Sequence, residues 1–398
     1  MEAIQYLKSI PRYLLARYGG SHWPALYTSG FATVKRVDIE PPGLPSPGWI
    51  RIRPRLSGIC GSDTATITAK GSTYFSPFTS TPFVFGHEVV AQVAEGVAGS
   101  PLKRGDRVLL EPPLHCRIRE IDPPCGACRE GRTHHCINID RGVISPGIQS
   151  GFCRDTGGGW SQEMVAHSSQ LTAVPDGLPD ELAVLTEPLS CCLHAAKKAV
   201  LGRQQTAVVF GCGTMGLLTI LATRSLYPDA RIVAVAKYEH QKTSAAQLGA
   251  DRVIAAPASL EDLTAELGGR TYPAELGRPS VLGGGADVFL DCIGSSRSID
   301  DAMRLTRPGG RIIMVGMPSV PEGVDWTAMW HKELHLEGSY TSDRSTFNEA
   351  LALVAVSAEK LKGFVGARFP LEDYRTAIRT ALNAGREGVI KVAFEIRQ

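Results

Sequence analysis

A regular alternation of short apolar runs with helix-length stretches, which begins near residue 205, constrains the fold more than any other feature of this sequence. The apolar runs read TAVVFG, RIVAVA, ADVFLDCIG and GGRIIMVGM, and they alternate with GTMGLLTILATRSLY, TSAAQLGAD and DDAMRLTR. Apolar strands that alternate with helices predict a parallel sheet covered on both faces. We therefore expect a doubly wound α/β domain in this part of the chain.

The first strand of this domain leads into a glycine-rich turn. The stretch VVFGCGTMG places Gly211, Gly213 and Gly216 between a strand and a helix, in the G-x-G-x-x-G spacing. The first two glycines allow a tight turn and the approach of a pyrophosphate, and the third allows the helix to pack closely on the strand. Glycines that only make a tight turn are the alternative. We predict a dinucleotide site that also includes Thr214 and Met215.

The end of the second strand bears on the choice between NAD and NADP. An acidic residue there would bind the ribose 2′-hydroxyl of NAD, but RIVAVA ends in Ala236 and is followed by Lys237 and Tyr238. The sequence favours NADP, since Lys237 can pair with a 2′-phosphate, while Glu239 keeps NAD open. A solvated surface charge is the alternative for Lys237. The remaining cofactor-binding residues that we predict are Tyr238, Gly294 and Gly316.

The rest of the chain has a different pattern. Up to about residue 185 it is rich in Pro and Gly, with short strand-like runs such as GWIRIRPRL, EVVAQVAEG and DRVLLEP. These runs predict an irregular, mostly β domain. The tail contains a helical stretch, FNEALALVAVS, and a strand-like run, GVIKVAFEI, while TYPAELGRPSVLGGG predicts a loop insertion before residue 286. A chain of 398 residues is long enough for two domains.

Composition argues against polyanionic and membrane partners. The 42 basic and 40 acidic residues leave a formal charge of +2, which gives no footprint for a nucleic acid or an anionic membrane surface. No stretch approaches the roughly 20 apolar residues of a spanning helix, and the N-terminal stretch is broken by Pro11. We expect a soluble, cytoplasmic protein. In a reducing cytosol, its ten cysteines favour metal binding over disulfides.

Two short segments of the first domain carry metal-binding residue types. GICGSD contributes Cys60, Ser62 and Asp63, and FGHEVV contributes His87 and Glu88. A thiolate, an imidazole and a carboxylate from separate loops form an open zinc site, in which one position is left for water or substrate. Each segment alone would be ordinary, because a lone cysteine is usually a small hydrophobe and a His-Glu pair usually lies in a turn. Their joint occurrence favours the metal.

The segments GICGSD, GHEVV, a multi-cysteine lobe, EPLSCCLHA and GCGTMG occur in an order that resembles zinc-dependent medium-chain dehydrogenases, closest to the polyol and threonine dehydrogenase branch. The resemblance implies a GroES-like catalytic domain (1–187 and 332–398) with a structural zinc lobe at about 111–140, and a Rossmann domain at 188–331. It implies hydride transfer between NAD(P) and a secondary alcohol of the polyol, sugar or amino alcohol class. It also implies one catalytic and one structural Zn2+ per chain, and a homodimer or homotetramer.

The resemblance assigns roles at the catalytic zinc. Cys60 and His87 bind it, Glu88 binds it directly or exchanges with water, and Asp63 orients the imidazole. Ser62 passes the alcohol proton toward the cofactor ribose, and a local turn hydrogen bond is the alternative for its hydroxyl. Ala65 stands where some relatives continue this relay with a histidine.

Two metal ligands stay open between alternatives. In TEPLSCC, polyol-type relatives have a glutamate near the metal where Glu187 stands, and other relatives use a cysteine where Cys191 stands; we favour Glu187. In the lobe, Cys125, Cys128 and Cys136 have the family's spacing, and that spacing puts Asp122 at the first position. Cys116, which an insertion within RIREIDPP would separate from the others, is the stronger zinc ligand, and we favour it.

Three other functions are alternatives to this one. A zinc ribbon that binds nucleic acid is disfavoured by the balanced charge and by the lack of a second Cys or His pair at the usual distance. A zinc-free reductase of activated double bonds would lack the ligand set Cys60, His87 and Glu88. A family member that binds cofactor without catalysis stays open.

Overall fold

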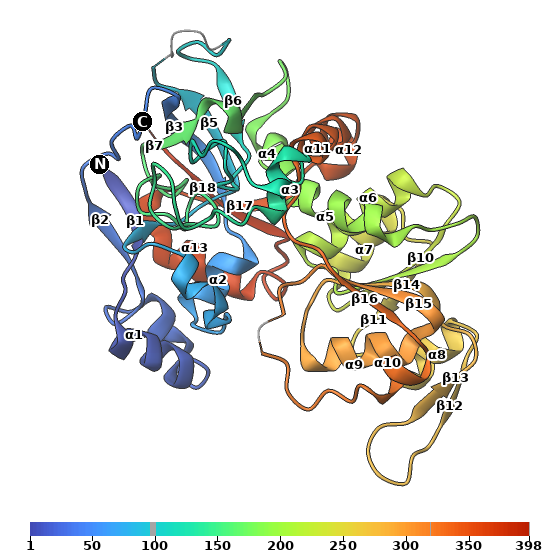
Figure 1. Ribbon diagram of the computed structural model, residues 1–398. Coiled ribbons are helices and arrows are strands. Elements are labelled where there is room, and N and C mark those ends of the chain that lie inside the picture. Colours follow the sequence, from blue (N-terminus) through green and yellow to red (C-terminus); the bar gives the residue numbers. More distant parts are fainter. Residues whose placement is uncertain (96–100, 319, 398) are drawn as a thin grey trace. The chain divides into compact units, whose positions relative to one another are not determined.

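The computed structural model describes residues 1–95, 101–318 and 320–397, and the chain divides into two compact units (Figure 1). Unit 1 comprises Met1–Glu187 and Ser342–Gln398, so it is built from both ends of the chain. Unit 2 comprises Pro188–Thr341. No helix among the described residues is long and apolar enough to cross a membrane.

Unit 2 is built on a six-stranded parallel sheet with the order β11-β10-β9-β14-β15-β16. Helices α6 and α7 lie on one face, and α8, α9 and α10 lie on the other (Figure 1). The predicted doubly wound sheet is therefore confirmed. The strands are β9 (Thr206–Phe210), β10 (Arg231–Ala236), β11 (Arg252–Ala255), β14 (Ala286–Asp291), β15 (Thr306–Met314) and β16 (His335–Gly338). The helices are α6 (Thr214–Leu226), α7 (Glu239–Leu248), α8 (Leu260–Glu266), α9 (Ser296–Leu305) and α10 (Thr327–His331).

The apolar runs of the sequence form the centre of this sheet. Strands β9, β10 and β14 are buried along most of their length, as expected where helices cover both faces. Unit 2 extends beyond residue 331 to Thr341, because β16 pairs with β15. The stretch predicted as a loop contains a small hairpin of β12 (Arg270–Tyr272) and β13 (Ser280–Leu282), whose strands are too short and exposed to give an apolar run.

Unit 1 is mostly β. A seven-stranded sheet has the order β17-β18-β3-β5-β6-β8, with β7 paired to β3, and a three-stranded sheet has the order β2-β1-β4. The strands are β1 (Glu2–Tyr6), β2 (Val34–Asp38), β3 (Trp49–Gly58), β4 (Phe83–Val84), β5 (Val89–Val93), β6 (Arg107–Leu110), β7 (Met164–His167), β8 (Leu171–Ala173), β17 (Val365–Phe369) and β18 (Lys391–Glu395).

Short helices connect the strands of unit 1. The α-helices are α1 (Ile10–Leu14), α2 (Gly61–Ile67), α3 (Gly126–Arg129), α4 (Asp180–Ala183), α11 (Arg344–Val356), α12 (Ala358–Leu361) and α13 (Tyr374–Asn383), and α5 (Thr186–Ala199) runs from unit 1 into unit 2. The other helical segments are η1 (Leu15–Gly19), η2 (Pro24–Thr28), η3 (Thr73–Phe78), η4 (Thr133–His135), η5 (Ser168–Gln170) and η6 (Leu371–Asp373).

The last strand of the chain completes the sheet that the N-terminal half begins. Strand β18 pairs antiparallel with the end of β3, with Ala393 opposite Gly58 and Phe394 opposite Ser57. Phe394 also packs with Phe85 and Trp160 in one buried apolar cluster. This pairing brings the start of β18 to the place where β3 ends and the segment of Cys60 begins.

Candidate active site and metal centres

Three predicted metal ligands come together in unit 1. Cys60 follows β3 and is the N-cap of α2, while His87 and Glu88 lie between β4 and β5. One ligand atom from each of the three lies within 4.8 Å of the other two. His87 and Glu88 are buried and Cys60 is half-buried. A sulfur, a nitrogen and a carboxylate oxygen at this separation suit a zinc ion with a further position open.

Asp63 supports two of these residues from the first turn of α2. Its Oδ2 accepts the backbone N–H of Cys60 at 2.9 Å, and its Oδ1 lies 3.5 Å from Nδ1 of His87. Burial raises the pKa of Asp63 to about 6, although His87 acts in the opposite direction. The carboxylate is placed to orient the imidazole, as the resemblance implies.

The site is rich in negative charge. Burial alone would lower the pKa of His87, but the negative groups Asp63, Cys60 and Glu187 raise it to about 10. The pocket therefore stabilises a positive charge at the imidazole, and a divalent cation can supply that charge. The donor set and its electrostatics both fit zinc.

A buried lysine that the sequence analysis missed belongs to this site. Nζ of Lys391, the first residue of β18, donates to Oε1 of Glu88 at 2.6 Å and to the carbonyl oxygen of Ile59 at 3.1 Å. Lys391 is 3% exposed and Glu88 is 1% exposed. A side chain at Gly58 would collide with Glu88, since a Cβ there would lie 1.8 Å from Oε2. A lysine inside the apolar run GVIKVAFEI is the signal that could have found it.

Ser62 and Glu187 also lie in unit 1. Oγ of Ser62 is buried and has no hydrogen-bond partner among the described residues, so the alternative role of Ser62, a local turn hydrogen bond, is not formed there. Glu187 lies in the first turn of α5 and is outside the 4.8 Å group, but its charge raises the pKa of His87 and of Lys391. Cys191 lies further along α5, in unit 2.

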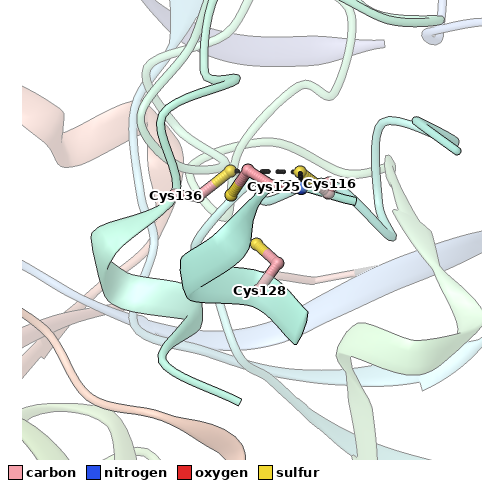
Figure 2. Close-up of side chains that lie close together, drawn as sticks. All are labelled: Cys116, Cys125, Cys128 and Cys136. Carbon is pink, nitrogen blue, oxygen red and sulfur yellow. Dashed lines mark hydrogen bonds between the residues drawn. The ribbon is translucent and has the colours of Figure 1, made fainter. Parts of the chain in front are cut away.

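The structure brings together four cysteines in the lobe of unit 1. The sulfur atoms of Cys116, Cys125, Cys128 and Cys136 lie within 4.8 Å of one another (Figure 2). All four are free thiols, and the Sγ atoms of Cys116 and Cys136 are 3.6 Å apart. Asp122 is exposed and is not a member of this group. Four sulfurs at this separation suit a closed, tetrahedral zinc site.

Hydrogen bonds favour the thiolate form at Cys125, whereas burial opposes it at Cys136. Sγ of Cys116 accepts the backbone N–H of Cys125 at 3.3 Å and the amide of Asn138 at 3.2 Å. Burial would raise the pKa of Cys125, but backbone N–H groups of Ile137 and Cys128 contribute to lowering it to about 6. Burial and the neighbouring sulfur of Cys116 raise the pKa of Cys136 to about 11. Thiolates this close together repel one another, and a divalent cation bound among them would offset that repulsion.

A fully buried arginine holds the lobe in shape. Arg119 lies within the predicted insertion, and its guanidinium donates to the carbonyl oxygens of Leu114, Arg141, Ile144, Ser145 and Gly147 at 2.8 to 3.3 Å. These acceptors stand before and after the cysteine segment in sequence. One side chain therefore ties both ends of the lobe together.

The glycine-rich turn of unit 2 has the geometry of a phosphate cradle. Gly211 has a φ of +96°, and a Cβ there would lie 2.5 Å from Ile293. A Cβ at Gly216 would lie 1.8 Å from the carbonyl oxygen of Gly211, so helix α6 packs directly on the turn. Gly213 has nothing within 4 Å of that position, which leaves room for a pyrophosphate. Thr214 and Met215 open helix α6, whose N-terminus suits an anion.

The other predicted cofactor residues lie at the carboxyl ends of neighbouring strands. Lys237 and Tyr238 follow β10, and Nζ of Lys237 lies 5.5 Å from the centre of the Tyr238 ring. Gly294 follows β14 and Gly316 follows β15. They are in close contact, since a Cβ at Gly294 would lie 3.1 Å from the carbonyl oxygen of Gly316. The carboxyl ends of parallel strands are where open α/β sheets bind their ligands.

Comparisons with known proteins agree with this geometry. The family model described as alcohol dehydrogenase GroES-like domain matches residues 46–176, and the one described as zinc-binding dehydrogenase matches residues 214–356. An L-idonate 5-dehydrogenase of Vitis vinifera is 29% identical and covers 91% of this chain and 93% of its own. An uncharacterized zinc-type alcohol dehydrogenase-like protein of Haemophilus influenzae is 30% identical over 77% of this chain and 80% of its own.

The solved structures agree on the fold. The crystal structure of galactitol-1-phosphate dehydrogenase from Escherichia coli aligns with a TM-score of 0.73 at 20% identity, and the alignment covers 99% of this chain and 100% of that one. This match extends over both units.

Proposed function

The chain belongs to the zinc-dependent medium-chain dehydrogenase family, in its polyol dehydrogenase branch, and we propose that it oxidises a secondary alcohol with NADP and reduces the corresponding ketone. As a member of this family the protein is an oxidoreductase that interconverts alcohol and carbonyl compounds with NAD(P). The substrate that we propose is a polyol, a sugar or an amino alcohol. One observation carries the proposal: the meeting of Cys60, His87 and Glu88 at an open ligand set.

The residues of unit 1 have separate tasks in this reaction. Zinc, when bound, polarises the alcohol oxygen, and the nicotinamide accepts the hydride. Cys60 and His87 would hold the metal, and Asp63 would fix the imidazole. Ser62 has a buried hydroxyl without a partner, and we assign it to receive the alcohol proton. Glu187, whose charge reaches His87, is our choice over Cys191 for the metal or its water.

The lobe is proposed to hold a second, structural zinc. Its four cysteines leave no position for a substrate, because a tetrahedral zinc ion is complete with four thiolates. The lobe therefore stabilises the long loop around Arg119 and takes no part in hydride transfer.

NADP is the preferred cofactor in this proposal. No acidic side chain stands at the end of β10, where Ala236 is followed by the exposed Lys237. The ammonium of Lys237 is available for a 2′-phosphate, and replacing it with alanine should raise KM for NADP and leave KM for NAD nearly unchanged. An equal rise for both cofactors would contradict this assignment.

The protein is further proposed to act as a homodimer or homotetramer in the cytoplasm. Its ten free thiols suit a reducing compartment. Analytical ultracentrifugation of the zinc-loaded protein tests the assembly, and a monomer would overturn that part of the proposal.

The deciding experiment is a turnover screen run together with zinc counting. Secondary alcohols, polyols, sugars and amino alcohols, with their carbonyl counterparts, are tested with NADP(H) and NAD(H). We expect turnover of at least one of these substrate classes. Cys60→Ser and His87→Ala should each abolish this turnover and remove one zinc equivalent from the protein. Reduction of activated double bonds that survives both substitutions would overturn the proposal and favour a zinc-free reductase.

A further inference from the structure

The segment between β1 and β2 of unit 1 is longer than the pairing of these two strands requires. Tyr6, the last residue of β1, lies opposite Val34, the first residue of β2. Antiparallel strands in this register can be joined by a short turn, but here the chain inserts residues 7–33, which contain α1, η1 and η2. None of the candidate metal ligands comes from this insertion, so neither the sheet nor the metal sites account for it.

One side of the insertion is fixed to the rest of unit 1. Ala16 belongs to a buried apolar cluster of the unit, and Tyr13 packs against that cluster. The guanidinium of Arg12 donates to the carbonyl oxygens of Gly30 and Ala32, both at 2.8 Å. These contacts hold the helical stretch that α1 and η1 form in one orientation, with one side toward the core and the other toward solvent.

The side toward solvent carries large apolar side chains. Ile10, Leu14 and Tyr18 follow one another at intervals of four residues, a spacing that places side chains on one face of a helix. Trp23 lies beside the end of this stretch, since a Cβ at Gly19 would lie 3.9 Å from its ring. All four side chains are between 46% and 73% exposed. We call Ile10, Leu14, Tyr18 and Trp23 the apolar face, because apolar residues gathered in this way mark interaction sites.

The charge of the insertion has a single sign. Residues 7–33 contain Lys8, Arg12 and Arg17 and no Asp or Glu. None of these three bases forms an ion pair with a described residue. The formal charge of +2 averages over the whole chain, so it does not describe this surface. The insertion therefore combines exposed apolar and aromatic side chains with positive charge that no acidic side chain of the described structure compensates.

This combination matches an anionic lipid surface. Helical segments with Leu and aromatic residues on one side and basic residues beside them lie in the interface of a membrane, where the apolar side chains enter the headgroup boundary and the bases attract anionic lipids. Tyr and Trp are enriched at this depth. A second copy of the chain fits less well, because a symmetric dimer would place the same uncompensated bases against one another.

We propose that the insertion 7–33 docks the protein on an anionic membrane surface, with Leu14, Tyr18 and Trp23 entering the interface and Lys8 beside the lipid headgroups. The contacts of Tyr13 and Ala16 hold the apolar face in place before the membrane is met, so docking orders little further chain. The inference is independent of the proposed function, since no residue of the insertion is a candidate metal ligand or cofactor-binding residue.

The test is co-sedimentation of the zinc-loaded, full-length protein with vesicles of phosphatidylcholine alone and of equimolar phosphatidylcholine and phosphatidylglycerol. We expect binding to the anionic vesicles and little binding to the neutral ones. Added salt should weaken the binding, because it screens contacts between exposed charges. The anionic vesicles should also shift tryptophan emission of the wild type to the blue, and Trp23→Phe should remove that shift.

Substitutions on the apolar face separate this site from the rest of the surface. Leu14→Ser/Tyr18→Ser should lower the partition coefficient for anionic vesicles by at least about 10-fold, and Lys8→Glu should lower it by at least about 5-fold. Two matched controls should leave it unchanged: Leu276→Ser, at a leucine of unit 2 that is 91% exposed, and Lys362→Glu, at an exposed lysine. All these side chains are exposed, so thermal midpoints should stay at the wild-type value.

Several results would overturn the proposal. A wild type that does not bind the anionic vesicles is one, and binding that Leu14→Ser/Tyr18→Ser leaves unchanged or that Leu276→Ser weakens equally is another. Binding of poly-glutamate that equals vesicle binding and survives Leu14→Ser/Tyr18→Ser would assign the surface to an acidic protein. Self-association without vesicles that this double variant abolishes would assign it to a second copy. The turnover screen decides the proposed function separately from all of these results.

Discussion

At the scale of single residues, the candidate active site contains buried polar groups that the fold itself leaves incompletely bonded. Oγ of Ser62 has no hydrogen-bond partner within the described part of the chain, whereas Nδ1 of His87 faces Oδ1 of Asp63 at 3.5 Å. Buried polar atoms without partners are uncommon in folded proteins, and they are frequent at functional sites. The fold therefore keeps the hydroxyl of Ser62 available for a group that binds there.

Removing the hydroxyl of Ser62 should affect turnover and leave the metal bound. A positioned proton-transfer group contributes about 10²- to 10⁴-fold to a rate, so we expect Ser62→Ala to lower kcat by at least about 100-fold with unchanged zinc content. Ser57→Ala is the matched control, because the Oγ of Ser57 is also buried without a partner and lies in β3. Equal rates for Ser62→Ala and the wild type would remove Ser62 from the relay.

The first ligand of the lobe can be tested in the same way. Cys116 is buried within the group of four sulfurs, whereas Asp122 is exposed. We expect Cys116→Ser to lower the zinc content from about two ions per chain to about one and Asp122→Ala to leave it unchanged. Metal analysis of the purified variants measures this, and the reverse result would assign the ligand to Asp122.

At the scale of elements, two glycines in the turn between β9 and α6 serve different purposes, one in packing and one in binding. Gly216 lies where a Cβ would collide with the carbonyl oxygen of Gly211, whereas Gly213 has open space and a φ of −76° that any residue adopts. The two glycines share one motif, but the structure indicates different reasons for them. One is required by the contact of helix and turn, and the other by what approaches the turn.

Alanine substitutions should reveal this difference. Gly216→Ala is expected to destabilise the protein without ligand by about 1–3 kcal/mol, because the backbone must move to accept the methyl group. Gly213→Ala is expected to leave the thermal midpoint of the ligand-free protein unchanged and to weaken NADP binding. Thermal unfolding and a fluorescence titration with NADPH measure the two effects. A loss of stability in Gly213→Ala would contradict the assignment.

At the scale of the whole molecule, different kinds of group compensate the charge of two buried lysines. Lys391 in unit 1 faces a carboxylate, and its pKa is raised because Glu88 and Cys60 outweigh the opposing effect of burial. Among the described residues, Lys332 of unit 2 donates to the carbonyl oxygens of Met303, Arg304 and Thr306. Burial, with the charge of Arg304, lowers its pKa to about 8. Folding therefore favours the neutral amine of Lys332 and the charged form of Lys391.

The depressed pKa of Lys332 predicts a change in stability at alkaline pH. Between pH 8 and the ordinary value of 10.5, the unfolded chain binds more protons at this residue than the folded chain does. Its contribution to the free energy of unfolding therefore rises with pH in this window, by at most about 1.4 kcal/mol per pH unit. Below pH 8 both states are protonated and the contribution is constant.

Thermal midpoints of the wild type and of Lys332→Met, measured from pH 7 to pH 10, test this. The wild type should gain stability relative to the variant above pH 8. The effect of thiol ionisation on stability cancels in this comparison, because both proteins contain the same cysteines. Parallel curves over the whole range would show that Lys332 does not titrate in this window.

The sequence by itself determined the fold of both units and most of the candidate ligands. Apolar periodicity and the spacing of glycines are local properties, so the parallel sheet and the turn at Gly211 could be predicted without coordinates. The residues Cys60, His87 and Glu88 were found because each stands in a short segment with a recognisable order.

The tertiary structure alone decided the contacts between residues that lie far apart in the sequence. Only the pairing of β18 with β3 brings Lys391 to Glu88, from residues some three hundred positions away in sequence, and only the lobe's folding brings Cys116 to Cys125, Cys128 and Cys136 across an insertion. Spacing predicts neighbours along a helix or a strand, but contacts between distant segments depend on how strands register and loops close. Lys391 is buried beside Glu88 because β18 pairs with β3.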